Sequence, residues 1–348
     1  MSEQPPPVPA VTNPQPAALH IVSPLIDAPE LARRHGIKHL FIKNEVVQPS
    51  GSFKIRGIGH YIARQLALHP ELTQVVSSSG GNAGMAATVA AGKLGLTAEV
   101  FVPTSTPLSM AQRLKAAGAQ VIVAGNVWDE AHASAIEHVA KQPPGTALLV
   151  HPFEGVDIWE GHSTIIDEIS RQLPCGVVPD AVVCVVGGGG LLAGVIRGLE
   201  RCYSNAQQRC PVVVAVETAG AAAYAAAIAA GSDKPVALTG ITSIAKSLGA
   251  LQVTPEALAA RTRYGKQNVR SLVVTDKQAA AAAIAFADDF RLLVEASCGA
   301  GLALAYGPDE LSKAVPELRP DSCVVFIGCG GALVSLDVMN AWKTTFEL

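Results

Sequence analysis

Residues 181–199 read AVVCVVGGGGLLAGVIRGL, which is an apolar run, four consecutive glycines and a second apolar run. The glycines and Arg197 interrupt this stretch too early for a membrane-spanning helix, which needs about 20 continuous apolar residues. A buried strand at residues 181–186, a glycine turn and a helix from Leu191 explain the pattern better. A strand without polar alternation is typical of a parallel sheet that helices cover on both faces.

The same alternation of short apolar runs and helical patterns recurs along the chain. It predicts an α/β fold with mainly parallel sheets flanked by helices. Thr254-Pro255 and Thr275-Asp276 are typical helix starts, because a hydroxyl side chain precedes the first turn. The predicted strands are residues 39–43, 74–77, 98–102, 147–150, 181–186, 212–216 and 323–327, and the predicted helices are residues 85–94, 109–117, 127–141, 161–173 and 191–202.

The chain length favours two lobes. A single hydrophobic core seldom keeps growing beyond about 250 to 300 residues, and this chain has 348. We place the lobe boundaries near Arg56 and Val150. The sequence thus predicts a large domain of residues 19–55 and 151–348 and a small domain of residues 56–150. Residues 1–18 include six prolines and are predicted to form a disordered tail.

Composition and charge argue against several classes of protein. A formal charge of -3 and 5% aromatic residues give no basic, base-stacking surface, so we expect no nucleic-acid or membrane partner. The seven cysteines include no C-x-x-C pair, which argues against structural zinc and favours a reducing, cytoplasmic compartment. No Lys or Arg precedes Arg33, so the start of the chain resembles neither a signal peptide nor a transit peptide.

Ligands of parallel sheets bind at the carboxyl ends of the strands, and the first turn of this kind is residues 77–84, SSSGGNAG. It follows the strand predicted at residues 74–77 and opens a helix. Clustered hydroxyls, unhindered backbone amides and a helix N-terminus favour a carboxylate site. An ordinary strand-to-helix turn, capped by Asn82, explains this segment equally well.

The second turn is the run from Gly187 to Gly190, followed by Leu191. Four glycines allow backbone N–H groups to converge on a phosphate at a helix N-terminus. The segment lacks the third glycine of a dinucleotide motif, because position 192 is Leu, and it lacks the Lys-Ser/Thr ending of a P-loop. A phosphate without a nucleotide is the favoured interpretation, and close packing of helix on strand is the alternative.

A third turn, residues 328–331 (GCGG), places Cys329 at the end of a predicted strand. A buried thiol packs as a small hydrophobic group in most proteins. Its position at the carboxyl end of the strand also makes it a candidate for a weak polar contact with a ligand.

Lys54 lies in residues 49–57, PSGSFKIRG, after a Ser/Gly turn and at the start of a helical pattern. A partly desolvated amine there has a lowered pKa and becomes nucleophilic. A helix-start lysine without a chemical role fits this segment equally well. The histidines have no metal-ligand spacing and are interpreted as packing or solvated side chains: His60, His132, His138, His151 and His162.

An amine, a carboxylate site and a phosphate site together meet the needs of pyridoxal phosphate acting on an amino acid. The chain resembles the fold type II pyridoxal-phosphate enzymes, which have the tryptophan synthase β-like fold, and in particular serine/threonine dehydratases of the liver-type L-serine dehydratase group. The resemblance keeps its order from about residue 19 to about residue 340. The matching segments are residues 50–60 (SGSFKIRGIGH), 79–85 (SGGNAGM), 159–162 (WEGH), 187–192 (GGGGLL), 294–300 (VEASCGA) and 329–331 (CGG).

The resemblance implies a role for each matched residue. Lys54 would form the internal Schiff base with pyridoxal phosphate, and Phe53 would stack on the pyridine ring. Asn82 would bind the ring hydroxyl, and Cys329 would face the pyridine nitrogen. The remaining assignments are Gly187, Gly188, Gly189, Gly190 and Leu191 for the phosphate, and Ser79, Gly80, Asn82 and Ala83 for the substrate carboxylate.

The family also implies a homodimer and a monovalent cation, K⁺, near the phosphate loop. The corresponding positions are Glu217, Ala221, Leu248 and Ala250.

The expected activity is elimination of water from L-serine and L-threonine, giving ammonia and pyruvate or 2-oxobutanoate, in amino-acid catabolism and gluconeogenesis. Lys54 would remove the Cα proton. A neutral thiol at Cys329 stabilises a protonated pyridine nitrogen less than a carboxylate does, which favours rapid loss of the hydroxyl group. The alternatives are a β-replacement enzyme, a racemase, which Gly80 disfavours because it has no proton-transfer group, and a non-catalytic binding protein, which Lys54 disfavours.

Overall fold

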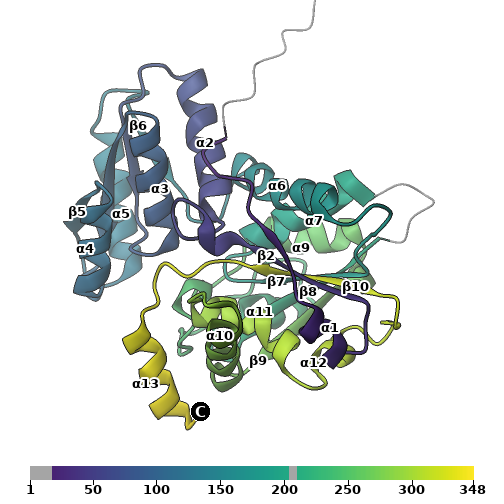
Figure 1. Cartoon of the computed structure of the whole chain (residues 1–348). Coiled ribbons are helices and arrows are strands. Elements are labelled where there is room, and N and C mark those ends of the chain that lie inside the picture. Colours follow the sequence, from purple (N-terminus) through teal and green to yellow (C-terminus); the bar gives the residue numbers. More distant parts are fainter. Residues whose placement is uncertain (1–17, 204–209) are drawn as a thin grey trace, which may run out of the picture.

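The computed structural model describes residues 18–203 and 210–348, arranged around two sheets (Figure 1). The predicted tail therefore lies outside the described residues, apart from Ala18. The larger sheet has the strand order β1-β2-β10-β7-β8-β9 and is parallel except for β1, which pairs antiparallel with β2. Its strands are β1 Leu25–Asp27, β2 His39–Asn44, β10 Cys323–Gly328, β7 Ala181–Val185, β8 Val212–Thr218 and β9 Val269–Val274.

The smaller sheet has the order β5-β4-β3-β6 and is parallel throughout. Its strands are β3 Gln74–Ser77, β4 Thr97–Val102, β5 Gln120–Val123 and β6 Ala147–Val150. With helices α2 Lys54–Leu68, α3 Asn82–Lys93, α4 Leu108–Ala116 and α5 Trp128–Ala140 it forms what we call the small lobe. The boundaries at residues 56 and 150 stay a prediction.

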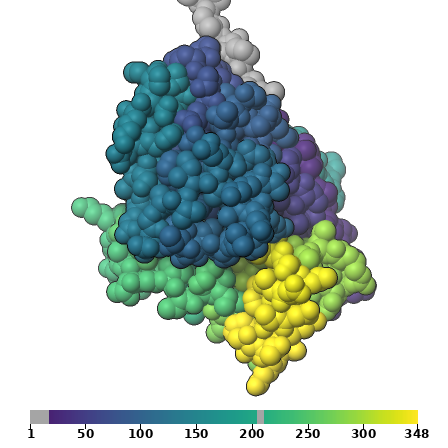
Figure 2. Space-filling view, turned by 90° about the vertical axis from the view of Figure 1, so that its left-hand side faces the viewer, coloured from purple at the N-terminus to yellow at the C-terminus, as the bar shows by residue number. Residues whose placement is uncertain are grey.

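The remaining helices accompany the larger sheet, and together they form the large lobe. Figure 2 shows the small lobe in blue and teal, with the C-terminal helix in yellow below it. Within the described residues, no helix is long and apolar enough to cross a membrane. The helices of the large lobe are α1 Pro29–Arg34, α6 Val156–Gln172, α7 Gly190–Tyr203, α8 Ala223–Ala229, α9 Pro255–Tyr264, α10 Asp276–Phe290, α11 Ala296–Tyr306, α12 Glu310–Ala314 and α13 Leu336–Phe346, with short 3₁₀ turns η1 Glu45–Val47, η2 Lys246–Leu248 and η3 Lys266–Asn268.

The α/β prediction is confirmed, and every predicted strand is present to within two residues at either end. The three strands that the sequence did not reveal, β1, β5 and β9, all lie at sheet edges. Edge strands are covered on fewer sides, so most residues of these three strands are half-buried or exposed and the continuous apolar signal is weakened.

The two predicted helix starts behave differently. Thr275 forms a complete capping box with Gln278 at the start of α10. Helix α9 does begin at Pro255, but the side chain of Thr254 makes no capping hydrogen bond, so that part of the prediction is wrong. The backbone N–H of Thr254 instead donates to the carbonyl of Gly188 at 2.8 Å, which ties the start of α9 to the glycine loop.

A buried network of charges joins the two lobes at the start of α2. Arg56 donates through Nε to Glu45 Oε2 at 2.6 Å and through Nη1 to Glu168 Oε1 at 2.7 Å. Lys43 Nζ donates to Glu168 Oε2 at 2.5 Å. All four side chains are at most 3% exposed. Burial raises the pKa of Glu168, but hydrogen bonds and charges of Arg56 and Lys43 outweigh it and leave that pKa below its ordinary value.

Loss of the central cation of this network should be costly. Arg56→Gln leaves the carboxylates of Glu45 and Glu168 buried without their shared partner, so we expect the free energy of unfolding to fall by about 3–5 kcal/mol. The control variant Arg33→Gln breaks an exposed ion pair with Glu30, so it should change the free energy of unfolding by less than about 1 kcal/mol. Urea denaturation measures both values. Equal stability of the two variants would contradict the importance of the network.

Candidate functional site

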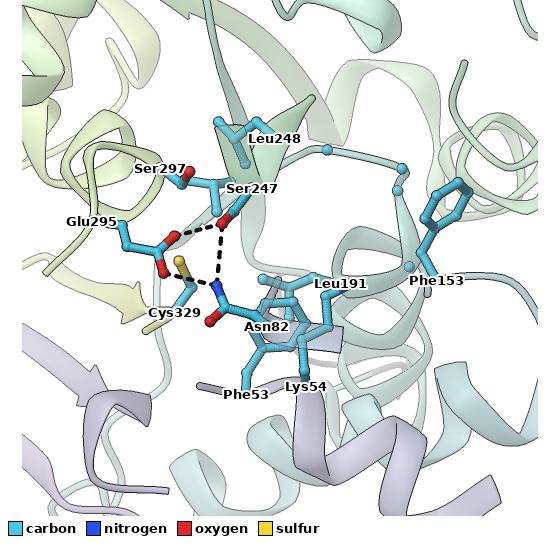
Figure 3. Close-up of a pocket in the computed structure, with 15 residues that line it drawn as sticks. Phe53, Lys54, Asn82, Phe153, Leu191, Ser247, Leu248, Glu295, Ser297 and Cys329 are labelled. Carbon is cyan, nitrogen blue, oxygen red and sulfur yellow. Dashed lines mark hydrogen bonds between the residues drawn. The ribbon is translucent and has the colours of Figure 1, made fainter. Parts of the chain in front are cut away.

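A pocket lies between the lobes at the start of α2 (Figure 3). It contains every residue that the sequence assigned to the cofactor. The lining residues are Phe53, Lys54, Asn82, Phe153, Val185, Gly187, Gly188, Gly189, Gly190, Leu191, Ser247, Leu248, Glu295, Ser297 and Cys329.

Lys54 is the first residue of α2, and contacts on both sides fix its backbone. The N–H of Phe53 donates to the carbonyl of Cys329 at 3.0 Å, and Arg56, two residues later, is held in the charge network. The amine Nζ donates to the carbonyl of Pro152 at 2.6 Å. Burial lowers the pKa of Lys54 from 10.5 to about 8, against a smaller opposing effect of Cys329. Such an amine is partly neutral near physiological pH and is a competent nucleophile and base.

Phe53 lies beside this amine, with its ring centroid 5.3 Å from Lys54 Nζ. The centroid of the same ring lies 4.9 Å from that of His162. His162 is fully buried, neither of its ring nitrogens has a hydrogen-bond partner among the described residues, and burial lowers its pKa well below 6.5. His162 is therefore a neutral packing residue that fixes the position of the Phe53 ring.

The glycine loop connects β7 to α7. Among the described residues, the backbone N–H groups of Gly187, Gly188 and Gly189 have no hydrogen-bond partner. Unpaired amides at the N-terminus of a 14-residue helix are suited to an anion such as a phosphate.

Packing also requires glycine in this loop. A Cβ at Gly188 would lie 2.3 Å from the ring of Phe153, and Gly189 has φ +88°. The same glycines therefore admit the Phe153 ring and leave amides unpaired, so a packing role and an anion site are compatible in this loop.

Of the four residues assigned to the substrate carboxylate, only Asn82 lines the pocket. Ser79 Oγ accepts from the N–H of Gly81 at 3.3 Å, and Ala83 is buried in the core of the small lobe. A side chain at Gly80 would meet Thr106 and Val102, within the small lobe. The assignment of Ser79, Gly80 and Ala83 to the carboxylate stays a prediction.

Asn82 takes part in a hydrogen-bond cluster that the sequence did not reveal (Figure 3). Its Nδ2 donates to Glu295 Oε1 at 2.9 Å and to Ser247 Oγ at 3.2 Å. Ser247 Oγ donates to Glu295 Oε2 at 2.5 Å, and the N–H of Leu333 donates to Glu295 Oε1 at 2.9 Å. Burial raises the pKa of Glu295, although these donors oppose the effect. Asn82 Oδ1 is buried and has no partner within residues 18–203 and 210–348, so it is available to a ligand hydroxyl.

A second thiol, that of Cys298 on α11, acts on Cys329. The influence of Cys298, together with burial, raises the pKa of Cys329 well above 9. Cys329 is therefore a neutral thiol at the pocket wall. The hydroxyl of Ser297 is buried nearby in the lining and has no partner among the described residues.

The residues assigned to the cation lie on two segments. Glu217 is fully buried at the end of β8, where its carboxylate accepts from the N–H groups of Tyr224 at 2.8 Å and Ala225 at 2.7 Å. Burial raises its pKa to about 7, against those hydrogen bonds. Ala221 follows on the same segment, whereas Leu248 and Ala250 lie on the loop around η2, where Leu248 packs on Gly187.

A hydroxyl contact connects these two segments. Thr218, next to Glu217, contacts Ser243 of the η2 loop with 2.8 Å between the two hydroxyl oxygens. In the described part of the chain, this region included, no cluster of three or more His, Cys, Asp or Glu side chains suits a metal ion.

Comparisons with known proteins identify the family of the chain. Residues 18–330 match the family model described as pyridoxal-phosphate dependent enzyme. The chain is 42% identical to human "Serine dehydratase-like" over 335 residues, which cover 93% of this chain and 94% of that protein. It is 40% identical to "L-serine dehydratase" of Saccharomyces cerevisiae (strain AWRI1631) over 309 residues, 85% of this chain and 89% of that one.

A solved structure is similar as well. The structure of a fungal L-serine ammonia-lyase from Rhizomucor miehei superimposes with a TM-score of 0.84 at 33% identity, covering 95% of this chain and all of that one.

The lowered pKa of Lys54 predicts when its amine becomes reactive. In protein prepared without added cofactor, acetylation of Lys54 should reach half of its maximal rate near pH 8, because burial disfavours the charged form. Peptide mass spectrometry across a pH series measures this midpoint. A midpoint near the ordinary lysine value of about 10.5 would contradict the desolvated amine.

Proposed function

Because the chain belongs to the pyridoxal-phosphate-dependent enzyme family, we propose that it eliminates water from L-serine and L-threonine. The products are ammonia and pyruvate or 2-oxobutanoate. The relatives at 40–42% identity carry names that refer to serine dehydratases. We also propose a homodimer in the cytoplasm that acts in amino-acid catabolism and gluconeogenesis and binds neither nucleic acid nor membrane, with a small domain of residues 56–150.

One observation carries this proposal. Lys54 presents an amine with a pKa of about 8 in the same pocket as three backbone amides that no described residue pairs. An amine alone, or an anion site alone, fits many proteins. An amine and a phosphate cradle in one pocket fit a phosphorylated aldehyde, which the amine captures while the cradle holds the phosphate.

The residues present fit pyridoxal phosphate, which when bound withdraws electrons from the Cα atom of an amino acid. Lys54 would hold the cofactor and would serve as the general base for the Cα proton. Gly187, Gly188, Gly189, Gly190 and Leu191 would hold the phosphate through amides and the dipole of α7. Phe53 would pack on the ring, Asn82 would bind the ring hydroxyl, and Cys329 would contribute a neutral thiol near the ring nitrogen. Ser79, Gly80, Asn82 and Ala83 would receive the substrate carboxylate.

We also propose that Glu217, Ala221, Leu248 and Ala250 bind a monovalent cation, K⁺. The supporting observation is the carboxylate of Glu217, which is fully buried and makes no ion pair with any described residue. Burying an ionised carboxylate without a cation is unfavourable in free energy. The raised pKa of Glu217 has the same cause, because burial disfavours its charged form. A cation bound there would neutralise the charge.

No observation favours the alternative activities. A racemase needs a second proton-transfer group, and Gly80 provides none at the position where racemases carry serine. A non-catalytic binding protein has no need for a desolvated amine.

The central test removes the amine. Lys54→Ala should abolish formation of 2-oxo acid from L-serine and L-threonine, because no other lining residue provides a free base. Lys141→Ala changes an exposed lysine on the small lobe and should retain full activity. A coupled assay of 2-oxo acid with a panel of hydroxy amino acids measures both. Wild-type turnover by Lys54→Ala, or no product from wild-type protein with pyridoxal phosphate, would contradict the proposed function.

The cation proposal predicts a pH dependence. Without a cation, the pKa of Glu217 is raised above 4.5, so its contribution to stability is present below about pH 4.5 and lost as pH rises through about 7. K⁺ binds the carboxylate form and restores stability above that pH. Replacing choline chloride by KCl at constant ionic strength should therefore raise Tm more at pH 8 than at pH 6. Glu217→Gln should remove the difference, and an equal rise at both pH values would refute the site.

A further inference from the structure

The segment from His151 to Glu154 connects β6 in the small lobe to α6 in the large lobe. The proposed function gives it no role, and the sequence suggested only a packing or solvated histidine at position 151. In the structure, this segment contacts both the amine and the glycine loop.

The first contact is with Lys54. The carbonyl of Pro152 accepts the hydrogen bond from Lys54 Nζ at 2.6 Å. It is the only hydrogen-bond partner of that amine among the described residues. The orientation of the Pro152–Phe153 peptide therefore decides where the amine is held.

The second contact is with the glycine loop. The Phe153 ring occupies the space where Gly188 has no Cβ, and the carbonyl of Phe153 lies 2.5 Å from the position that a Cβ of Gly190 would take. That carbonyl also accepts from Trp159 Nε1 at 3.0 Å. Phe153 thus supports the loop that presents the unpaired amides.

His151 holds this segment in shape. Its Nδ1 accepts from the N–H of Phe153 at 3.3 Å and from the N–H of Glu154 at 2.9 Å. Nδ1 therefore carries no proton, in agreement with a pKa lowered to about 4 by burial, and then by His132 and Lys54. The ring also stands edge-on to Phe153, with 4.6 Å between centroids, and to His132, at 6.4 Å.

The geometry of one peptide group connects these facts. The N–H of Phe153 and the carbonyl of Pro152 belong to the same planar trans peptide, so they point in opposite directions. Fixing the N–H on His151 aims the carbonyl at Lys54. We propose that His151 is a positioning residue, whose Nδ1 holds the Pro152 carbonyl on the Lys54 amine and the Phe153 ring against the glycine loop. This inference rests on the proposed function and adds a residue to that site.

Two variants separate the acceptor from the ring. His151→Asn keeps an oxygen acceptor for the following N–H groups, since Asn side chains cap turns in this way, but it loses the ring contacts. His151→Phe keeps a ring against Phe153 and His132 but has no acceptor. The measurements are the dissociation constant of pyridoxal phosphate, from absorption titration of the apoenzyme, and the melting temperature of the apoenzyme.

We expect His151→Phe to weaken cofactor binding at least tenfold and His151→Asn to stay within threefold of wild type, with similar melting temperatures. If His151→Phe does not fold, His151→Ala takes its place, and the same loss of cofactor affinity is expected. The inference would be overturned if His151→Phe bound pyridoxal phosphate with wild-type affinity. It would also be overturned if His151→Phe and His151→Asn lost affinity equally. Wild-type apoenzyme that binds no pyridoxal phosphate would instead contradict the proposed function, so the two failures are distinguishable.

Discussion

The position of the reactive amine depends on the buried guanidinium of Arg56. Two carboxylates, Glu45 and Glu168, hold this group without exposure to solvent, and Lys43 balances the second of them. Apolar side chains of similar volume fill such a space at no greater cost in stability. Apolar side chains do not, however, fix the direction in which the start of α2 runs. A guanidinium group that is hydrogen-bonded on two sides does fix it. Because Arg56 is two residues from Lys54, this directional constraint sets where the first turn of α2 and its amine lie.

The contacts across the pocket are of a different kind. Asn82 of the small lobe donates to Ser247 and Glu295 of the large lobe, and Arg113 donates to the carbonyl of Ala332. The contacts of Asn82 with Ser247 and of Arg113 with Ala332 are exposed, so they can exchange with water or a ligand at little net cost, unlike buried apolar packing. The charge network therefore anchors α2 firmly, while the opposite rim of the pocket is held by bonds that are easily replaced. Such an arrangement suits a site that must admit a substrate and then enclose it.

The sequence allowed prediction of those features that leave a local pattern. Continuous apolar runs revealed the central strands, and glycine turns at their ends revealed the loop at Gly187 and the position of Lys54. The edge strands left a weaker pattern because they are only partly covered. The cluster of Asn82, Ser247 and Glu295 left none, since its members are separated by more than 40 residues and meet only in the folded chain. The same holds for the contact of Phe153 with Gly188.

The protonation states of the pocket bear on which reaction it favours. Its lining contains three titratable side chains, those of Lys54, Glu295 and Cys329. The carboxylate of Glu295 already accepts from three donors, and the raised pKa of Cys329, caused by Cys298 and by burial, keeps that thiol neutral. Lys54, held by a single carbonyl among the residues that the structure describes, is the lining group able to exchange a proton freely. Racemisation needs one proton-transfer group on each face of Cα, whereas elimination needs a single base. A pocket with one available base therefore favours loss of the leaving group over return of the proton to the opposite face.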